Sequence, residues 1–218
     1  MERRFARITL TAALALGLVT GSAARASDKT AKAKDTTKTE VAKSEVPKTD
    51  AKHDQMMEAM MKMAMPGPMH DLLKPMAGTW KATTKSWMAE GEPAVSEGTS
   101  ENTWILGNRY LQTTFHGAFG GMPFEGYGLT GYDNQKKEFV SVWADNMGTG
   151  IAFSDGSADP SGKVLTMSSM MNDPATGKPV PYKMITKVAD ENLYSMSMIT
   201  VKDGKEHTEM EITYTRMK

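Results

Sequence analysis

Cysteine is absent from this chain of 218 residues. Its absence excludes disulfide bonds, metal centres built on thiolates, thiol nucleophiles and attachment of a lipid to an N-terminal cysteine. A protein without these constraints must be stabilised by the packing of its core, because burial of apolar surface is then the main favourable contribution to folding.

An excess of charge of either sign is also absent, since 26 basic residues balance 26 acidic ones. Nucleic-acid-binding chains carry clustered positive charge, so we expect no nucleic-acid partner. The sequence also has no Gly-x-Ser-x-Gly elbow, no His-Glu-x-x-His run and no Gly-x-Gly-x-x-Gly entering a helix. These absences predict a protein that is not an enzyme and that needs no cofactor.

Long apolar runs are scarce, and only the segment from Ile8 to Val19 stands out. Arginines precede it and Ala24-Arg25-Ala26 follows it, so residues 1–26 have the three parts of a secretory signal peptide. The run is about a dozen residues long, whereas a membrane-spanning helix needs about 20. We therefore expect cleavage near Ala26, a mature chain without a transmembrane segment, and a location in the periplasm or outside the cell.

The next segment, residues 27–52, is rich in lysine, threonine and alanine, with acids interleaved among the lysines. Low hydrophobicity and mixed charge are typical of a disordered linker. Residues 53–66 are good helix formers dominated by methionine, and Pro66-Gly67-Pro68 ends the run. The pattern predicts a short methionine-rich helix ahead of the main domain.

Residues 68–218 form the main domain, where apolar and polar residues alternate with a period of two between turn sequences. Turns such as 159–162, 173–177 and 190–192 contain Asp, Asn, Gly or Pro, which tolerate turn dihedrals. The pattern predicts about ten strands, at 79–88, 96–106, 110–117, 124–132, 138–145, 149–154, 164–171, 180–189, 193–202 and 206–217. Successive hairpins predict an all-β fold, an antiparallel up-and-down β-barrel without exposed edges.

Six short motifs are spaced along this domain, and they are informative when taken together. They are Gly78-Thr79-Trp80, Leu106-Gly107-Asn108-Arg109-Tyr110-Leu111, Pro123-Phe124-Glu125-Gly126-Tyr127-Gly128, Gly131-Tyr132-Asp133, Trp143-Ala144-Asp145 and Tyr214-Thr215-Arg216. Over residues 68–218 the chain thereby resembles a bacterial lipocalin-like (calycin-type) family known as a domain of unknown function. The resemblance implies a lipocalin-like barrel with a helical segment near its mouth, and it implies no established activity.

The same resemblance implies a structural closure of the barrel, in which Trp80 packs inside the closed end and Arg216 lies over its ring. A planar guanidinium can stack on an indole while its donors bond nearby carbonyls. The candidate rim or cavity groups that could orient a polar ligand head are Arg109, Tyr127, Tyr132, Trp143 and Asp145. The alternative is that these aromatic residues pack the core and that Arg109 pairs with an acid.

Strand alternation predicts which side chains of the last two strands face the interior. Met210 and Tyr214 share one face of the final strand, and Tyr194, Met196 and Met198 share one face of the preceding strand. Apolar and aromatic side chains of this kind are typical of a ligand cavity. We therefore predict an exported protein that binds a small hydrophobic or amphipathic molecule in the barrel.

The methionine-rich segment supports a second hypothesis, the binding of Cu(I). Four of its methionines lie along one stripe of a helix, and thioether sulfur is a soft ligand suited to Cu(I). The candidate metal ligands are His53, Met56, Met57, Met60, Met61 and His70. The alternative is that the methionines form the buried stripe of a helix lying across one end of the barrel.

Two other functions are compatible with parts of the sequence. The lysine-rich linker could reach an envelope component, which would make the chain a non-catalytic interaction protein. Haem binding occurs in a related barrel family, but the glycine-rich extension expected after Trp80 is absent here. His207 has the parity of a solvent-facing residue, which leaves His116 as the better candidate haem ligand.

Overall fold

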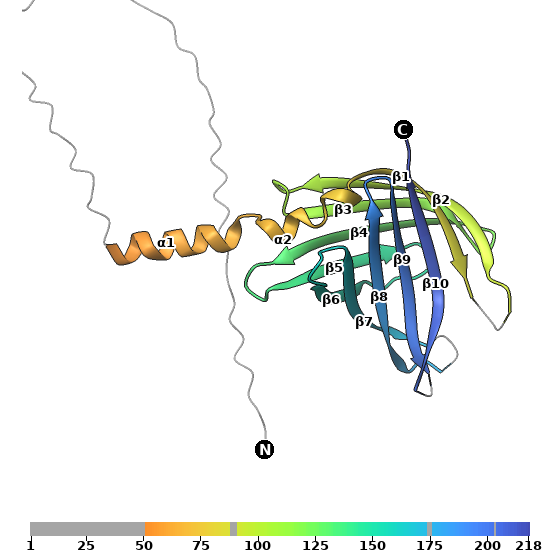
Figure 1. Cartoon of the computed structure of the whole chain (residues 1–218). Coiled ribbons are helices and arrows are strands. Elements are labelled where there is room, and N and C mark those ends of the chain that lie inside the picture. Colours follow the sequence, from red (N-terminus) through yellow and green to blue (C-terminus); the bar gives the residue numbers. More distant parts are fainter. Residues whose placement is uncertain (1–50, 88–90, 174–175, 203) are drawn as a thin grey trace, which may run out of the picture. The chain divides into compact units, whose positions relative to one another are not determined.

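A computed structural model describes residues 51–87, 91–173, 176–202 and 204–218 of this chain (Figure 1). The predicted signal peptide at 1–26 and the linker up to residue 50 lie outside the described residues. The helical elements are α1 (Ala51–Ala64), α2 (Pro68–Asp71) and the 3-10 helix η1 (Lys74–Met76). The strands are β1 (Gly78–Ser86), β2 (Ala94–Ile105), β3 (Tyr110–Phe119), β4 (Met122–Asp133), β5 (Glu138–Asp145), β6 (Ala152–Ala158), β7 (Val164–Asn172), β8 (Pro179–Asp190), β9 (Leu193–Lys202) and β10 (Lys205–Arg216).

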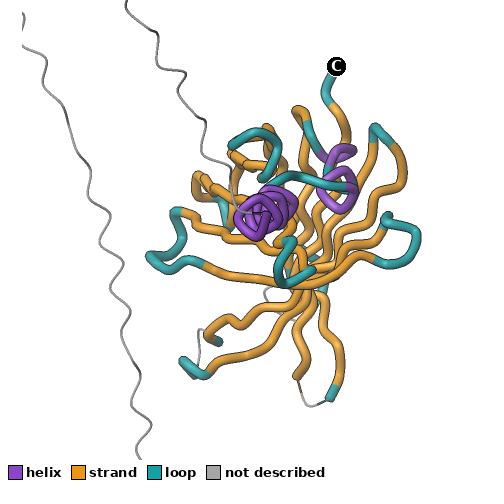
Figure 2. Tube along the Cα trace, turned by 90° about the vertical axis from the view of Figure 1, so that its left-hand side faces the viewer, coloured by secondary structure: helices purple, strands orange, loops and turns teal. Residues whose placement is uncertain are grey.

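These ten described strands form a closed antiparallel barrel in which each strand pairs with its neighbours in sequence. The barrel closes where β10 pairs with β1, and Trp80 stands opposite Arg216 in that register. Strands account for most of the described chain, as the orange trace in Figure 2 shows. The predicted all-β, up-and-down barrel of about ten strands is therefore confirmed.

The position of β6 differs from the prediction, because the strand lies at Ala152–Ala158 rather than at 149–154. The sequence Asp155-Gly156-Ser157 looks like a turn, yet it continues the strand. A Cβ at Gly156 would overlap the carbonyl oxygen of Thr166 on β7. The glycine is thus required by the close approach of two strand backbones rather than by a reversal of the chain.

The glycines of β4 have a related role. The strand is continuous from Met122 to Asp133, and Gly126 and Gly128 are both buried. A Cβ at either position would press on the indole ring of Trp143 from β5, and at Gly126 it would overlap the ring. These glycines therefore make room for an inward-facing aromatic ring. From the sequence alone, the glycines indicate only that the strand bends or that another group approaches it closely.

Helix α1 contributes nothing to the core, since none of its residues is buried although all of them are described. This finding corrects the alternative in which its methionines form a buried stripe across the barrel end. Good helix formers and the i,i+4 pair of Glu58 and Lys62 favour the helix locally, and Pro66 ends it. None of the helices in the described part of the chain has the length and apolar character needed to span a bilayer.

Candidate functional site

The interior of the barrel has one end that is closed by a packed floor. Trp80 is fully buried there and its Nε1 donates a hydrogen bond to the carbonyl of Met76, at 2.9 Å. The Cζ atom of Arg216 lies 4.1 Å from the centre of the Trp80 ring. Arg216 also donates to the carbonyls of Ala77 and Pro75, both at 2.8 Å, so the guanidinium ties η1 to the last strand.

Two tyrosines complete the floor, and both belong to the predicted cavity lining. The rings of Tyr194 and Tyr214 stack with centroids 4.2 Å apart, and Tyr194 meets Trp80 edge to face. The Nδ2 of Asn102 donates to the hydroxyl of Tyr194 at 3.1 Å and to the carbonyl of Met76 at 2.7 Å. Burial raises the pKa of both tyrosines, so they stay neutral hydrogen-bonding groups. They belong to the packed floor of the interior and are both buried.

Above this floor, one wall of the barrel carries a continuous row of methionines. Met210 pairs with Met198, Met198 with Met184, and Met184 with Met167, across four neighbouring strands from β10 to β7. We call these four residues the methionine row. Met167 is buried, whereas the other three are partly exposed although they face inward. Directly opposed side chains in a sheet lie about 5 Å apart, so the row presents a nearly unbroken thioether surface.

Sequence analysis missed two members of this row, Met167 and Met184. The signal that could have found them is the alternation of Tyr182, Met184 and Thr186 on β8 and of Leu165 and Met167 on β7. The predicted Met196 also faces inward, one step nearer the floor, and packs against the core. The unbranched, polarisable side chain of methionine adapts to ligands of different shape.

Polar groups lie between the methionine row and the end of the barrel away from Trp80, which we call the open end. Tyr182 pairs with Thr200, and both are buried. The Thr200 hydroxyl donates to a carboxylate oxygen of Glu209 at 2.5 Å. Alternation alone would point Glu209 to solvent, but the register shifts between Thr208 and Met210, and this bulge brings its carboxylate to the inward-facing Thr200. No residue type near Glu209 is typical of a bulge, so the sequence could not predict that the Glu209 carboxylate accepts a hydrogen bond from Thr200.

Trp143 and Asp145, both predicted as site residues, lie on the inward face of β5 toward the open end. The Nε1 of Trp143 donates to Asp145 Oδ2 at 2.8 Å, while Asp145 Oδ1 accepts the backbone N–H of Met147 at 3.0 Å. Phe115 and Phe124, in edge-to-face contact, continue the same aromatic side of the interior. The open half of the barrel therefore combines a thioether wall, an aromatic wall and carboxylate acceptors.

Arg109, predicted as a rim or cavity residue, lies at the closed end of the barrel, where it contacts the end of α1 and its own turn. Its Nε donates to the carbonyl of Ala64 at 2.9 Å, its Nη1 to the carbonyl of Leu106, and its Nη2 approaches the sulfur of Met65 at 3.7 Å. Asn134 donates to the carbonyls of Met63 and Met65, both at 2.9 Å. The last carbonyls of α1 need partners outside the helix, and these two side chains from the barrel turns supply them.

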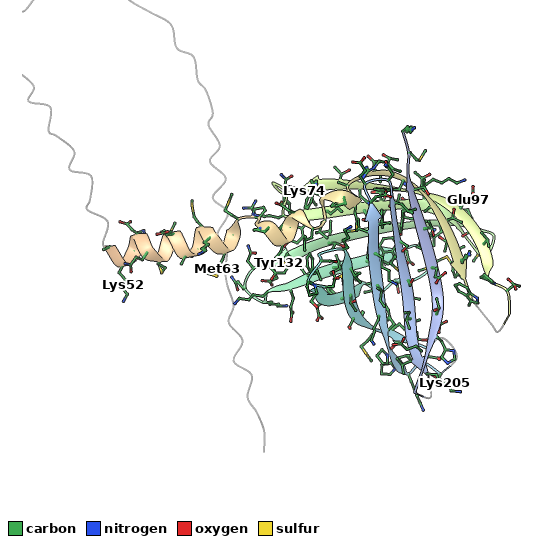
Figure 3. The ribbon with its side chains drawn as sticks, in the orientation of Figure 1. Lys52, Met63, Lys74, Glu97, Tyr132 and Lys205 are labelled. Atoms are coloured by element: carbon green, nitrogen blue, oxygen red, sulfur yellow. The ribbon has the colours of Figure 1, made fainter. Side chains whose placement is uncertain are left out.

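Tyr127 and Tyr132 also lie away from the interior of the open half. Tyr127 is 50% exposed and its hydroxyl donates to Glu125 at 2.7 Å on the outer face of β4. Tyr132, labelled in Figure 3, contacts the ring of His70 edge to face with centroids 6.0 Å apart, and it contacts Phe139 in the same way at 5.1 Å. The first is therefore a surface residue, and the second packs the closed end beneath α2.

His70 is a structural residue of that closed end. It is 4% exposed, and its Nδ1 accepts the backbone N–H of Gly67 at 3.1 Å, which fixes the start of α2. Burial lowers the pKa of His70, so the neutral ring is favoured. A surface groove of about 690 Å³ passes beside it, between the 65–68 segment and Trp104. His70 therefore stands apart from the exposed methionines of α1, with which the sequence analysis grouped it.

Comparisons with known proteins identify a family and similar solved structures. A family model described as "Protein of unknown function (DUF1579)" matches residues 65–216. The crystal structure of Rv2717c from M. tuberculosis is similar, with a TM-score of 0.52 and 16% identity over 71% of this chain and 100% of that chain. A redesigned beta barrel has a TM-score of 0.36 and 16% identity over 68% of this chain and 95% of that chain. No curated protein matches the sequence. The likeness to Rv2717c concerns the fold alone.

Proposed function

We propose that this chain, which belongs to the family described as Protein of unknown function (DUF1579), binds a small hydrophobic or amphipathic molecule in the open half of its barrel. The observation that carries the proposal is the methionine row, whose members at Met184, Met198 and Met210 face inward and stay partly exposed. Apolar side chains that face inward and still meet solvent are typical of a ligand site. Binding rather than catalysis is the proposed activity.

The polar groups of the open half indicate how such a molecule would be oriented. The apolar part would contact the methionine row and the aromatic side formed by Phe124 and Trp143. The polar part would lie nearer the open end, where Asp145 and Glu209 present carboxylate oxygens. A ligand head that donates hydrogen bonds would suit these acceptors, because ionised carboxylates can only accept.

A pair of tryptophan variants tests the proposal. Met198→Trp adds a large side chain to the inner wall, whereas Thr213→Trp adds the same side chain to an exposed position on the outer face of β10. With 1-anilinonaphthalene-8-sulfonate as the fluorescent probe, we expect the inner variant to bind about tenfold more weakly, a loss of about 1.4 kcal/mol. The outer variant should bind as the unmodified chain does.

Two results would contradict the proposal. One is equal binding of the probe by both variants, which would place the probe outside the barrel. The other is an absence of any probe binding by the unmodified chain, combined with a native mass that does not change on denaturation when the chain is purified from an exporting host. A discrete mass lost on denaturation would instead reveal a bound molecule and its chemical class.

Export through a cleaved signal peptide is a separate part of the proposal. The basic start, the apolar run from Ile8 to Val19 and the Ala24-Arg25-Ala26 sequence support it. Expression of the full chain in a bacterial host, followed by intact mass measurement of the periplasmic fraction, should give a chain that begins near Ser27. Recovery of the uncleaved chain from the cytoplasm alone would contradict export.

A further inference from the structure

Helix α1 exposes its methionines to an extent that core packing cannot explain. Met56, Met60 and Met63 are 55%, 54% and 44% exposed, and none of the residues of this fully described helix is buried. Figure 3 shows the yellow sulfur atoms along α1 between the labelled Lys52 and Met63. A helix that needed only to be soluble would carry charged residues in these positions, so the methionines call for another explanation.

The barrel holds the C-terminal end of this helix in place. Arg109 and Asn134 donate hydrogen bonds to the carbonyls of Met63, Ala64 and Met65, as described above. Met65 is engaged further, because its sulfur lies 3.7 Å from Nη2 of Arg109. The helix is thus attached through its end, and the thioethers along its length stay accessible to a ligand.

Helical geometry brings three of these thioethers together. At about 100° per residue, Met56, Met60 and Met63 occupy a sector of about 60°, with successive rises of about 6 and 4.5 Å along the axis. Methionine side chains are long and flexible enough for their sulfur atoms to converge on one point above Met60. The acids and the base at Asp54, Glu58 and Lys62 follow the opposite face with a spacing of four.

We propose that Met56, Met60 and Met63 form a three-sulfur site for Cu(I). Thioether sulfur is a neutral, soft donor that suits Cu(I) and is a poor ligand for hard cations such as Ca²⁺ or Mg²⁺. Among the described residues, no group of three or more His, Cys, Asp or Glu side chains could hold a metal ion, so a site of another kind does not compete there. His70 is buried at α2 and takes no part in the site.

Two triple variants of the full chain test this assignment. The first is Met56→Leu, Met60→Leu and Met63→Leu, in which leucine preserves both volume and helix propensity. The matched control is Met122→Leu, Met147→Leu and Met170→Leu, which removes three exposed methionines from the barrel. Each protein competes with the chromophoric chelator bicinchoninate for Cu(I), without oxygen and with ascorbate present.

We expect the unmodified chain and the barrel control to withdraw one Cu(I) per chain from the chelator. The helix variant should bind Cu(I) at least about tenfold more weakly, since it lacks the three soft donors. Equal Cu(I) affinity in the two variants would overturn the proposal. Failure of the unmodified chain to withdraw Cu(I) would overturn it as well.

A second measurement locates the metal and separates this site from the barrel cavity. Methionine methyl groups labelled with ¹³C should show three resonances that shift on addition of one equivalent of Ag(I), a redox-inert substitute for Cu(I). The same resonances should be missing in the helix variant, whose binding of 1-anilinonaphthalene-8-sulfonate should be unchanged. Shifts confined to the methionine row would overturn the assignment to α1.

Discussion

Helix α1 and the barrel wall from β7 to β10 are both rich in methionine, but they differ in what surrounds the side chains. In α1, Met60 is 54% exposed and none of the residues of the helix is buried. In the wall, Met167 is 5% exposed and stands in register with three more inward-facing methionines. The comparison shows that methionine content alone does not reveal a role, because the same side chain faces the interior of a barrel in one region and lies exposed along a helix in the other.

The largest expected difference between the two regions concerns stability. Met167→Ala should lower the free energy of unfolding by about 2–5 kcal/mol, because it leaves a cavity in a packed interior. Met60→Ala should change it by less than about 0.5 kcal/mol, since the side chain is exposed and alanine is a good helix former. Urea unfolding followed by circular dichroism measures both. Similar losses of unfolding free energy in the two variants would contradict the expectation that Met167 is packed in the core and Met60 is not.

Chemical reactivity should divide the methionines in the same way. Treatment of the folded chain with hydrogen peroxide should oxidise Met56, Met60 and Met63 about tenfold faster than Met167, because exposure governs sulfoxide formation. Peptide mass spectrometry after timed quenching gives the individual rates. The urea-unfolded chain is the control, in which the rates should converge. Equal oxidation rates in the folded chain would mean that Met167 in the barrel wall is as accessible to solvent as the methionines of α1.

The attachment between the two regions can be weakened on its own. Asn134→Ala removes two hydrogen bonds to the end of α1 and should cost about 0.5–1 kcal/mol, the lower range for exposed bonds. Hydrogen exchange should become faster at the C-terminal amides of α1 and stay unchanged in β7 to β10. Gln135→Ala in the same turn is the control. Faster exchange throughout the barrel would show that the helix and the barrel fold as one unit.

The smallest expected effect is a pH dependence at His70, where the helical segment meets the barrel. Burial lowers the pKa of His70 from its ordinary value of 6.5, so the folded state favours the neutral ring. The corresponding stability is present above about pH 6.5 and is lost as the pH falls and the unfolded chain takes up the proton. The urea midpoint should decrease from about pH 8 to about pH 5, and less so in His70→Gln. Identical pH profiles would assign the decrease to other groups.

Alternation and turn residues were sufficient to predict the barrel, because a meander depends on local patterns. The inward positions of Met196, Met198 and Met210 follow directly from the period of two in β9 and β10. Arg109 illustrates the limit, since two of its three partners, Ala64 at the end of α1 and the next residue Met65, lie 45 and 44 residues away in sequence. Such a contact depends on tertiary packing, which a local pattern does not encode.

Glu209 illustrates a second limit. One extra residue in β10 reverses the face on which its carboxylate lies, and alternation predicts the wrong side wherever a bulge intervenes. Tyr194 and Tyr214 illustrate a third limit. Strand alternation predicts that both side chains face the interior, but it does not indicate how far along the barrel axis they lie. The stacking of these rings near Trp80 makes them the floor of the barrel, a role that depends on strand register as well as on face.

The pairing of β1 with β10 has a consequence for how the protein could be attached to anything else. The N–H of Met217 bonds the carbonyl of Thr79, so the chain enters and leaves the barrel side by side at the closed end. The opposite, open end carries the C-terminal ends of β1, β3, β5, β7 and β9. Fusion to a support through the C-terminal residues that follow β10 would therefore leave the open end unobstructed, whereas attachment at the turn between β3 and β4 would direct that end toward the support.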